Sequence, residues 1–559
     1  MKQLLALVTA LLAGSTALAA KQAKNTYTTP DVPFEELYVP DFAAIGKELA
    51  KNKQKRMPAE ALEIPAGSSM DQFRKDFLAI GDSRHKLHDF LVKYDNPDFY
   101  NDPKVSADAK YFAAQAALIR PLRSVIYRLR HLFENTGGKI THSMSVTTVR
   151  NLAAFVSVYL PSSQWKAGFD YVTAPFENGV DEYTTLNHNG QKLTYKTYTN
   201  YQFKTVAEVQ KFVFFELNPR VKAAIRRIAD VMDKAGDPKS PFVWDNALLY
   251  PSATFKYKDG ANGGLLDNPE RFHVHGKAEV GLVLSALYAS VHRGAMFCAY
   301  KQEDLFAIVK KMGTLQGIDA WFNGADGELG VSKWDRVAII KEGNNVKFPE
   351  FLVLWDGKYD QGRNSRQHKI AADDVFGKKA AGNPGWGKFL MNEALGALRG
   401  AVAAHVNVWA VVREAQTGNV RDNVSTIINP LVLQAGTVHT DMQMKALSEM
   451  LKGPYQAFST ITGERVTINV PEMFTSPSED LKLLMPTAQK SVAQHPDVIS
   501  EGKPLKWRNY YAGQAGTWNM VEWSKYVQPE QGNMADALRI LRQAWGGDMV
   551  AGPMAFAIK

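Results

Sequence analysis

Two histidines separated by a single residue, His273 and His275, are one pair of side chains that could do chemistry. Alternate side chains of an extended segment lie on one face, so both imidazoles could bind the same ion. Many zinc and iron sites begin with such a pair of ligands, and Glu279 is the nearest carboxylate that could join them. The pattern is a hypothesis for a divalent metal site or an acid–base group. A surface or hydrogen-bonded histidine pair gives the same pattern, and we take that as the default interpretation.

A second group of polar side chains lies within residues 82–89. Side chains three or four positions apart share a face of a helix, which would bring together Asp82, His85 and Asp89, with His88 beside them. Such a group could bind a divalent metal or exchange a proton. An ordinary solvated helix face has the same composition, and we favour that alternative.

Aromatic residues gather in the stretch 506–526, which also contains glycines. Rings exposed on a loop could stack on sugars or on a partner surface. Rings buried in the core need no binding role, and this is the simpler interpretation. The binding hypothesis assigns the surface to Trp507, Tyr510, Tyr511, Trp518 and Trp523.

The familiar catalytic motifs are absent from the sequence. It contains no His-Glu-x-x-His, Gly-x-Ser-x-Gly, Walker or dinucleotide-binding pattern and no haem-binding Cys-x-x-Cys-His. The single cysteine, Cys298, cannot form an internal disulfide, and its apolar context favours a buried role over that of a nucleophile. Four arginines in an apolar pattern are interpreted as a solvated helix face or, alternatively, as a basic contact surface: Arg120, Arg123, Arg128 and Arg130.

The apolar run at 278–300 must position the histidine pair that precedes it. It is apolar on every side of a helical wheel, so it predicts a helix buried in a core or a membrane. A membrane span needs about 20 apolar residues, and Arg293 comes too early for that. We therefore predict a core helix, paired with a second apolar helix at 388–415. Small residues would let the two backbones approach closely: Gly396, Ala397, Gly400, Ala401 and Ala404.

The periodicity of the rest of the chain predicts a mainly α-helical body with a few β-hairpins. The Asn-Gly pair at 189–190 predicts a hairpin within 181–204, and Thr462-Gly463 indicates another. Pro121 and Pro219 are expected to kink or interrupt their helices, because proline lacks an amide hydrogen. A capping box is expected to begin at Ser69, with Gln72 three residues later.

The expected organisation has five parts. They are a signal peptide at 1–19, an extended arm at 20–67 with a short helix near 41–52, a helical region at 68–240, a mixed region at 241–385 with a hairpin at 336–355, and a helical C-terminal region at 386–559 with the aromatic-rich loop.

The first residues, MKQLLALVTALLAGSTALAA, have the pattern of a secretory leader. Lys2 precedes an apolar segment, and Ala17-Leu18-Ala19 fits a cleavage site after about Ala19. We expect a soluble periplasmic or secreted protein without a transmembrane anchor. The net charge of +9 is a mild excess over 559 residues, which fits a solvated surface or affinity for anionic envelope polymers. Nucleic acid is not an expected partner, because no basic–aromatic motif occurs.

Two functions remain compatible with these patterns. The first is a non-enzymatic binding protein whose partner is an anionic envelope polymer, a glycan or another protein. The alternative is a metal-dependent or acid–base hydrolase of envelope polymer that uses His273, His275 and Glu279. The absence of every enzyme motif that we tested favours the non-enzymatic binding protein.

Overall fold

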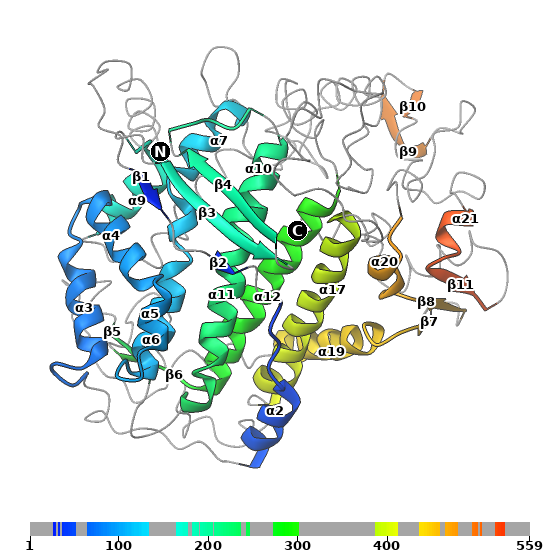
Figure 1. Cartoon of the computed structure of the whole chain (residues 1–559). Coiled ribbons are helices and arrows are strands. Elements are labelled where there is room, and N and C mark those ends of the chain that lie inside the picture. Colours follow the sequence, from blue (N-terminus) through cyan, green and yellow to red (C-terminus); the bar gives the residue numbers. More distant parts are fainter. Residues whose placement is uncertain are drawn as a thin grey trace.

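The computed structural model describes part of the chain, and all structural statements concern that part. It comprises residues 26–28, 32–33, 36–51, 64–133, 164–176, 181–188, 191–198, 200–204, 206–235, 242–245, 272–300, 386–411, 435–458, 464–478, 495–500, 503–505 and 520–530. These residues are mainly helical with few strands (Figure 1), which confirms the mainly α-helical part of the predicted fold class. The predicted hairpin at 336–355 and most of the aromatic stretch lie outside the described residues.

Three helices form the centre of the molecule: α11 (Asn218–Ala229), α12 (Lys277–Ala299) and α17 (Trp386–Ala404). They lie side by side, with α12 between the other two (Figure 1). The helix predicted at 278–300 is confirmed as α12; beyond its first turn the buried residues lie on one broad side of the helix, and Ala286 and Arg293 on the opposite side are exposed. By length and hydropathy α12 could also cross a membrane, but 56% of that apolar window is buried inside the protein, as is usual for a core helix.

The interface between α12 and α17 depends on small residues, as predicted. The ring of Tyr288 lies directly against Gly400, where a methyl carbon would come within 2.9 Å of a ring carbon. Ser285 donates its hydroxyl hydrogen to the carbonyl of Ala401 at 2.9 Å. Close approach therefore lets side chains of one helix reach the backbone of the other.

The N-terminal helices pack against the other side of α11. They are α3 (Ser69–Ala79), α4 (Arg84–Tyr94), α5 (Pro97–Asn101), α6 (Ala107–Ala117), α7 (Val125–Phe133) and α9 (Trp165–Thr173). The expected capping box at Ser69 is wrong by one residue, because Ser68 is the cap and accepts a hydrogen bond from the amide of Asp71 at 3.1 Å. Pro121 falls in a 3-10 turn, η2 (Arg120–Leu122), which separates α6 from α7 and confirms the predicted break.

The helix around Pro219 is continuous, although we expected an interruption. The helix α10 (Val206–Phe212) passes through a π-helical turn, η3 (Val213–Leu217), into α11. The amide of Asn218 donates to the carbonyl of Val213, five residues back. A widened turn provides room for a ring that would otherwise clash with a carbonyl of the preceding turn, and the missing proline amide is tolerated there.

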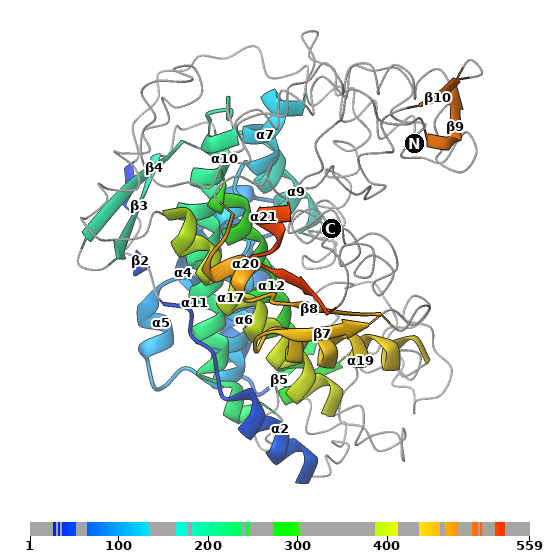
Figure 2. The same ribbon diagram turned by 90° about the vertical axis from the view of Figure 1, so that its right-hand side faces the viewer.

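Short sheets flank the helices on two sides (Figure 2). The predicted hairpin is confirmed as β3 (Asp181–His188) and β4 (Gln191–Tyr198), which pair antiparallel. Two short N-terminal strands, β1 (Thr26–Thr28) and β2 (Val32–Pro33), pair with β3 in parallel. The hairpin predicted around Thr462-Gly463 corresponds to the antiparallel pair β7 (Tyr455–Phe458) and β8 (Arg465–Ile468), to which β11 (Val527–Pro529) adds a third strand.

The remaining elements complete the description. They are the pair β5 (Phe242–Asp245) and β6 (Phe272–His275), the pair β9 (His495–Ser500) and β10 (Lys503–Leu505), the helices α2 (Phe42–Lys51), α19 (Ala435–Met450), α20 (Glu472–Thr475) and α21 (Met520–Trp523), the 3-10 turn η4 (Met232–Lys234) and the π-helical turn η8 (His405–Trp409).

Replacing Gly400 with valine should destabilise the protein, because the added carbons would collide with the ring of Tyr288. Overpacking of this kind costs about 1–3 kcal/mol and occasionally more. Urea unfolding measures the loss. Gly453→Val is the matched control, since nothing lies within 4 Å of a side chain at that glycine. Equal losses in the two variants would contradict a special role for the α12–α17 contact.

Candidate functional site

The predicted histidine pair lies on β6, immediately before α12. His273 is paired with Trp244 of β5, and its side chain lies outside the described residues. The Nδ1 atom of His275 is 2.8 Å from the hydroxyl of Tyr111 on α6. The His275 ring also packs edge-on against the ring of Phe112, with 5.4 Å between the ring centres. His275 is therefore held by aromatic neighbours.

Glu279 is almost completely buried, at 1% exposed, and it serves as a helix cap. Its Oε2 atom accepts a hydrogen bond from the amide of Gly276 at 2.8 Å, which satisfies one of the amides left free at a helix start. Its Oε1 atom is buried and has no hydrogen-bond partner among the described residues. Burial raises the pKa of this carboxyl to about 7, against the lowering effect of the two backbone amides that it accepts from.

The metal hypothesis for these residues stays a prediction. Within the described ranges, no three or more His, Cys, Asp or Glu side chains are grouped so that they could hold a metal ion. The side chain of His273 is not part of those ranges. What the structure does establish is a capping role for Glu279 and a tyrosine contact for His275.

The second predicted group is divided by the helix that carries it. Asp82 precedes α4, and Asp82, His85 and Asp89 are exposed. His88 points into the protein and is 4% exposed. His88 thus differs from the other three side chains in its burial, although the rings of His85 and His88 both pack edge-on against Phe176.

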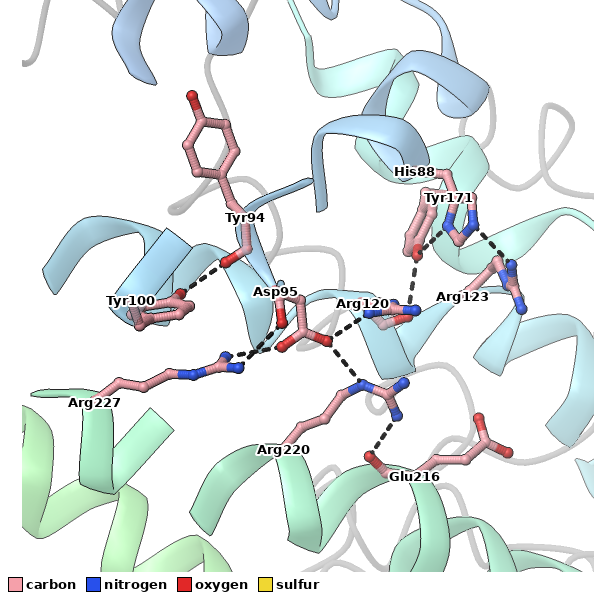
Figure 3. Close-up of polar contacts among 10 residues, drawn as sticks. All are labelled: His88, Tyr94, Asp95, Tyr100, Arg120, Arg123, Tyr171, Glu216, Arg220 and Arg227. Atoms are coloured by element: carbon pink, nitrogen blue, oxygen red, sulfur yellow. Dashed lines mark hydrogen bonds and ion pairs between the residues drawn. The ribbon is translucent and has the colours of Figure 1, made fainter. Parts of the chain in front are cut away.

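His88 belongs instead to a buried chain of hydrogen bonds (Figure 3). Its Nε2 atom is 3.1 Å from a guanidinium nitrogen of Arg123, and its Nδ1 atom is 3.4 Å from the hydroxyl of Tyr171. An arginine can only donate, so Nε2 accepts and Nδ1 carries the ring proton. Tyr171 in turn donates to the carbonyl of Arg120 at 3.0 Å. The contacts fix one neutral tautomer of His88 between α4 and α9.

Asp95, at the end of α4, is surrounded by three guanidinium groups (Figure 3). Its carboxylate lies 2.7 Å from Arg120, 2.8 Å from Arg227 and 3.4 Å from Arg220. Burial alone would raise the pKa of Asp95, but these positive charges hold the pKa below its usual value. The Arg227 side chain also lies over the ring of Tyr100, 4.0 Å from the ring centre. One carboxylate thus joins the N-terminal helices to α11.

A second buried ion pair lies close by, between Arg128 on α7 and Glu216 on η3. Two guanidinium nitrogens of Arg128 bind the two carboxylate oxygens at 2.9 and 3.2 Å. The rings of Phe203 and Phe212 lie 4.4 and 4.9 Å from the guanidinium carbon. This bidentate geometry is the strongest form of the arginine–carboxylate contact.

These contacts correct the interpretation of the arginines as a solvated face. Arg120, Arg123 and Arg128 are between 1% and 5% exposed. Arg120 pairs with Asp95 and Arg128 with Glu216, two carboxylates that the sequence patterns do not identify, whereas Arg123 contacts His88. Arg130 is only partly buried. The arginines themselves could have indicated these ion pairs. An arginine that lies among apolar residues on one face of a helix is expected to be buried, and a buried charge needs a partner.

The histidines of the two central helices do not meet. His292 on α12 has its Nδ1 atom 2.9 Å from the carbonyl of Ala394. The Nε2 atom of His405 on η8 is 2.9 Å from a carboxylate oxygen of Asp441 on α19. Ala394 and His405 are eleven residues apart along one helix, or about 16 Å. Each histidine thus contacts a different element.

The remaining candidates within the described residues, Trp523 and Cys298, are buried. Trp523 is 4% exposed and belongs to the hydrophobic core, which fits the simpler interpretation of the aromatic stretch. Trp507, Tyr510, Tyr511 and Trp518 lie outside the described residues. Cys298 is buried, and burial raises the pKa of its thiol, so the structure places it in the core as expected.

Comparison with protein-family models, with curated proteins and with solved structures finds no match to this chain.

Replacing Asp95 with asparagine should destabilise the protein strongly, because it leaves the buried guanidinium groups of Arg120 and Arg220 and the partly buried one of Arg227 around a neutral amide. Removing one partner of a buried ion pair costs about 3–5 kcal/mol. Urea unfolding at neutral pH measures the change. Asp89→Asn is the matched control on the same helix; because Asp89 is exposed, its replacement should change stability by less than about 0.5 kcal/mol. A small loss of stability in Asp95→Asn would contradict the role of Asp95 in holding the N-terminal helices on α11.

The buried carboxyl of Glu279 should make stability fall as the pH rises. Its pKa is about 7 in the folded protein, against 4.5 for an ordinary glutamate, so the folded state holds the proton more tightly. The contribution is complete below pH 4.5 and is lost as the pH rises through 7. The loss approaches about 3 kcal/mol at alkaline pH.

Thermal unfolding of the wild type and of Glu279→Gln between pH 5 and pH 9 tests this expectation. The amide mimics the protonated acid, so the variant should lose less stability over that range than the wild type. Identical pH profiles would show that Glu279 does not retain its proton.

Proposed function

We propose that the protein is an exported, soluble, non-enzymatic binding protein that acts in the periplasm or outside the cell. Its proposed partner is an anionic envelope polymer, a glycan or another envelope protein. The observation that carries the proposal is the structural use of the side chains that could do chemistry. Glu279 caps α12, His88 is fixed by Arg123 and Tyr171, and Cys298 is buried in the core.

The charge of the chain supports an anionic partner. Cleavage after about Ala19 removes Lys2 and lowers the net charge from +9 to +8. A net positive surface raises the local concentration of polyanions and speeds their encounter with the protein. Such attraction is screened by salt, because the Debye length falls to about 3 Å at 1 M salt.

Cosedimentation with isolated envelope fractions tests the proposal. The processed protein should pellet with the fractions at low salt and should return to the supernatant when salt is raised. Uncharged synthetic polymer particles of similar size serve as the control, and the protein should stay in solution with them. The proposal fails if the protein remains in the supernatant with envelope fractions at low salt.

The metal content of the purified protein distinguishes the hydrolase alternative from the binding proposal. A metal-dependent enzyme built on His273, His275 and Glu279 should carry stoichiometric metal after purification and should lose it in His273→Ala. Elemental analysis of both proteins gives the answer. Metal in the wild type that disappears in the variant would replace the binding proposal with the hydrolase.

A further inference from the structure

His88 lies in a chain of hydrogen bonds, all donated in one direction, that ties α4 to η2 and α9 (Figure 3). Arg123 donates to the Nε2 atom of His88 at 3.1 Å, and the His88 ring donates from Nδ1 to the hydroxyl oxygen of Tyr171 at 3.4 Å. Tyr171 donates its own proton to the carbonyl of Arg120 at 3.0 Å. A guanidinium has no acceptor atom and a hydroxyl has one proton, so the chain requires a neutral His88 with its proton on Nδ1.

A second proton on His88 would meet positive charges. The ring of Phe176 is 1% exposed and lies against the rings of His88 and His85, with 5.7 and 5.1 Å between ring centres. The guanidinium carbons of Arg84 and Arg123 lie 5.4 and 5.3 Å from the centre of the same ring. Protonation would remove the acceptor at Nε2, turn an N–H group toward the N–H of Arg123 and add a cation to this cluster. Charges that are buried together repel more strongly than charges in water.

The described carboxylates of α4 and of the helices packed against it contact other groups. Asp82 and Asp89 are exposed. The others have the following contacts: Asp71 of α3 with Lys75, Asp76 of α3 with Lys93 and Tyr94, Asp95 with its three arginines, Asp108 of α6 with the amide of Ala109, and Asp170 of α9 with Lys166. The charged and titratable groups that the described contacts place around His88 are Arg84, His85, Arg123 and Tyr171.

The residue that follows Arg123 has a backbone conformation that is unusual for its type. Ser124 has a φ of 55°, in the left-handed region that residues with a Cβ atom rarely adopt. Its amide donates to the carbonyl of Tyr171 at 2.7 Å, and its hydroxyl donates to the carbonyl of Ala174 at 2.9 Å. Strained conformations persist only where their surroundings enforce them, and they are common at switches. Loss of these two contacts would let Ser124 return to an ordinary conformation.

We propose that His88 is a pH-sensitive switch that releases the η2–α7 junction, residues 120–125, from α4 and α9. Below about pH 6.5 an ordinary histidine takes up its second proton. The contact of His88 with Arg123 then breaks, and the junction moves away with Ser124 as the hinge. The released state holds one more proton than the closed state, so acidification favours release, by up to about tenfold for each pH unit below 6.5.

The effect of release extends beyond the junction. Arg120, at the start of η2, receives the hydrogen bond of Tyr171 on its carbonyl and contacts Asp95 through its guanidinium at 2.7 Å. One three-residue turn thus joins the His88 chain to the buried ion pairs on α11. Release of the junction is therefore expected to loosen the N-terminal helices from α11 and to expose the ring of Phe176.

Hydrogen–deuterium exchange of the full chain, followed by mass spectrometry, tests the proposal. The measured rates are divided by those of unstructured peptides at the same pH, because chemical exchange itself depends on pH. Between pH 7.5 and pH 5.5 the corrected exchange of peptides covering 120–128 should rise about tenfold, as expected for one histidine proton. Peptides from α12 should show no rise. An unchanged rate at 120–128, or an equal rise in α12, overturns the proposal.

The variant His88→Gln identifies the proton. The glutamine amide oxygen occupies the same place along the side chain as Nε2, so it accepts from Arg123 and takes up no proton in this pH range. Exchange at 120–128 should then be independent of pH. His85→Gln is the matched control, since His85 is exposed on the same helix, and this variant should keep the tenfold rise. A pH response that survives in His88→Gln, or that disappears in His85→Gln, would contradict the assignment.

A second pair of variants tests the hinge. Ser124→Gly and Ser124→Ala both lose the hydroxyl contact with Ala174, but only alanine keeps the Cβ atom that disfavours a positive φ. At pH 5.5, exchange at 120–128 should be several-fold slower in the glycine variant than in the alanine variant. Equal rates would show that Ser124 is not the hinge and would overturn the proposal. None of these measurements uses an envelope partner, so their failure leaves the proposed function to be decided by cosedimentation.

Discussion

The close approach of α12 and α17 is the constraint on which the rest of the described structure depends. Glycine at position 400 lets the ring of Tyr288 lie on the α17 backbone, and the small residue at 401 exposes a carbonyl to Ser285. Most residues of α12 are apolar, and its broad buried side needs apolar neighbours, whereas the side with Ala286 and Arg293 is exposed. α11 covers a second side, and the arm covers the junction with α17 through Tyr38 and Phe42.

The buried charges have a different effect from the apolar interface. Taking a guanidinium and a carboxylate out of water costs about as much as their attraction returns, so Asp95 and its three arginines are not a large net source of stability. They do specify which surfaces meet. Only an arrangement that brings α4, η2 and α11 together neutralises Asp95, and a displaced helix would leave a buried charge without its partner. We infer that this network selects the packing of the N-terminal helices on α11.

Local patterns in the sequence predicted local structure well. The apolar run at 278–300 and the Asn-Gly turn at 189–190 identify α12 and the β3–β4 hairpin, because helix burial and a two-residue turn are set by neighbouring residues. The arginines were misinterpreted because their partners are distant in the chain. Asp95 meets Arg227 over 132 residues, and Arg128 meets Glu216 over 88 residues. No periodicity reports such a pairing, and it follows from how the helices pack.

The candidate sites also show that local sequence patterns do not predict how residues are placed relative to the core. The spacing of His88 with Asp82, His85 and Asp89 is that of a shared helix face, yet the core of the protein lies on the side of α4 that carries Leu87 and His88. The spacing of residues along a helix predicts which side chains can be neighbours. The position of the hydrophobic core determines which of those side chains are exposed to solvent. The two π-helical turns of the described residues, η3 and η8, also show the importance of packing. The turn at 213–217 precedes Pro219, and the turn at 405–409 presents the Asn407 carbonyl to Gly46. Both widened turns have a packing cause, so neither by itself indicates chemistry, and the second one places the arm.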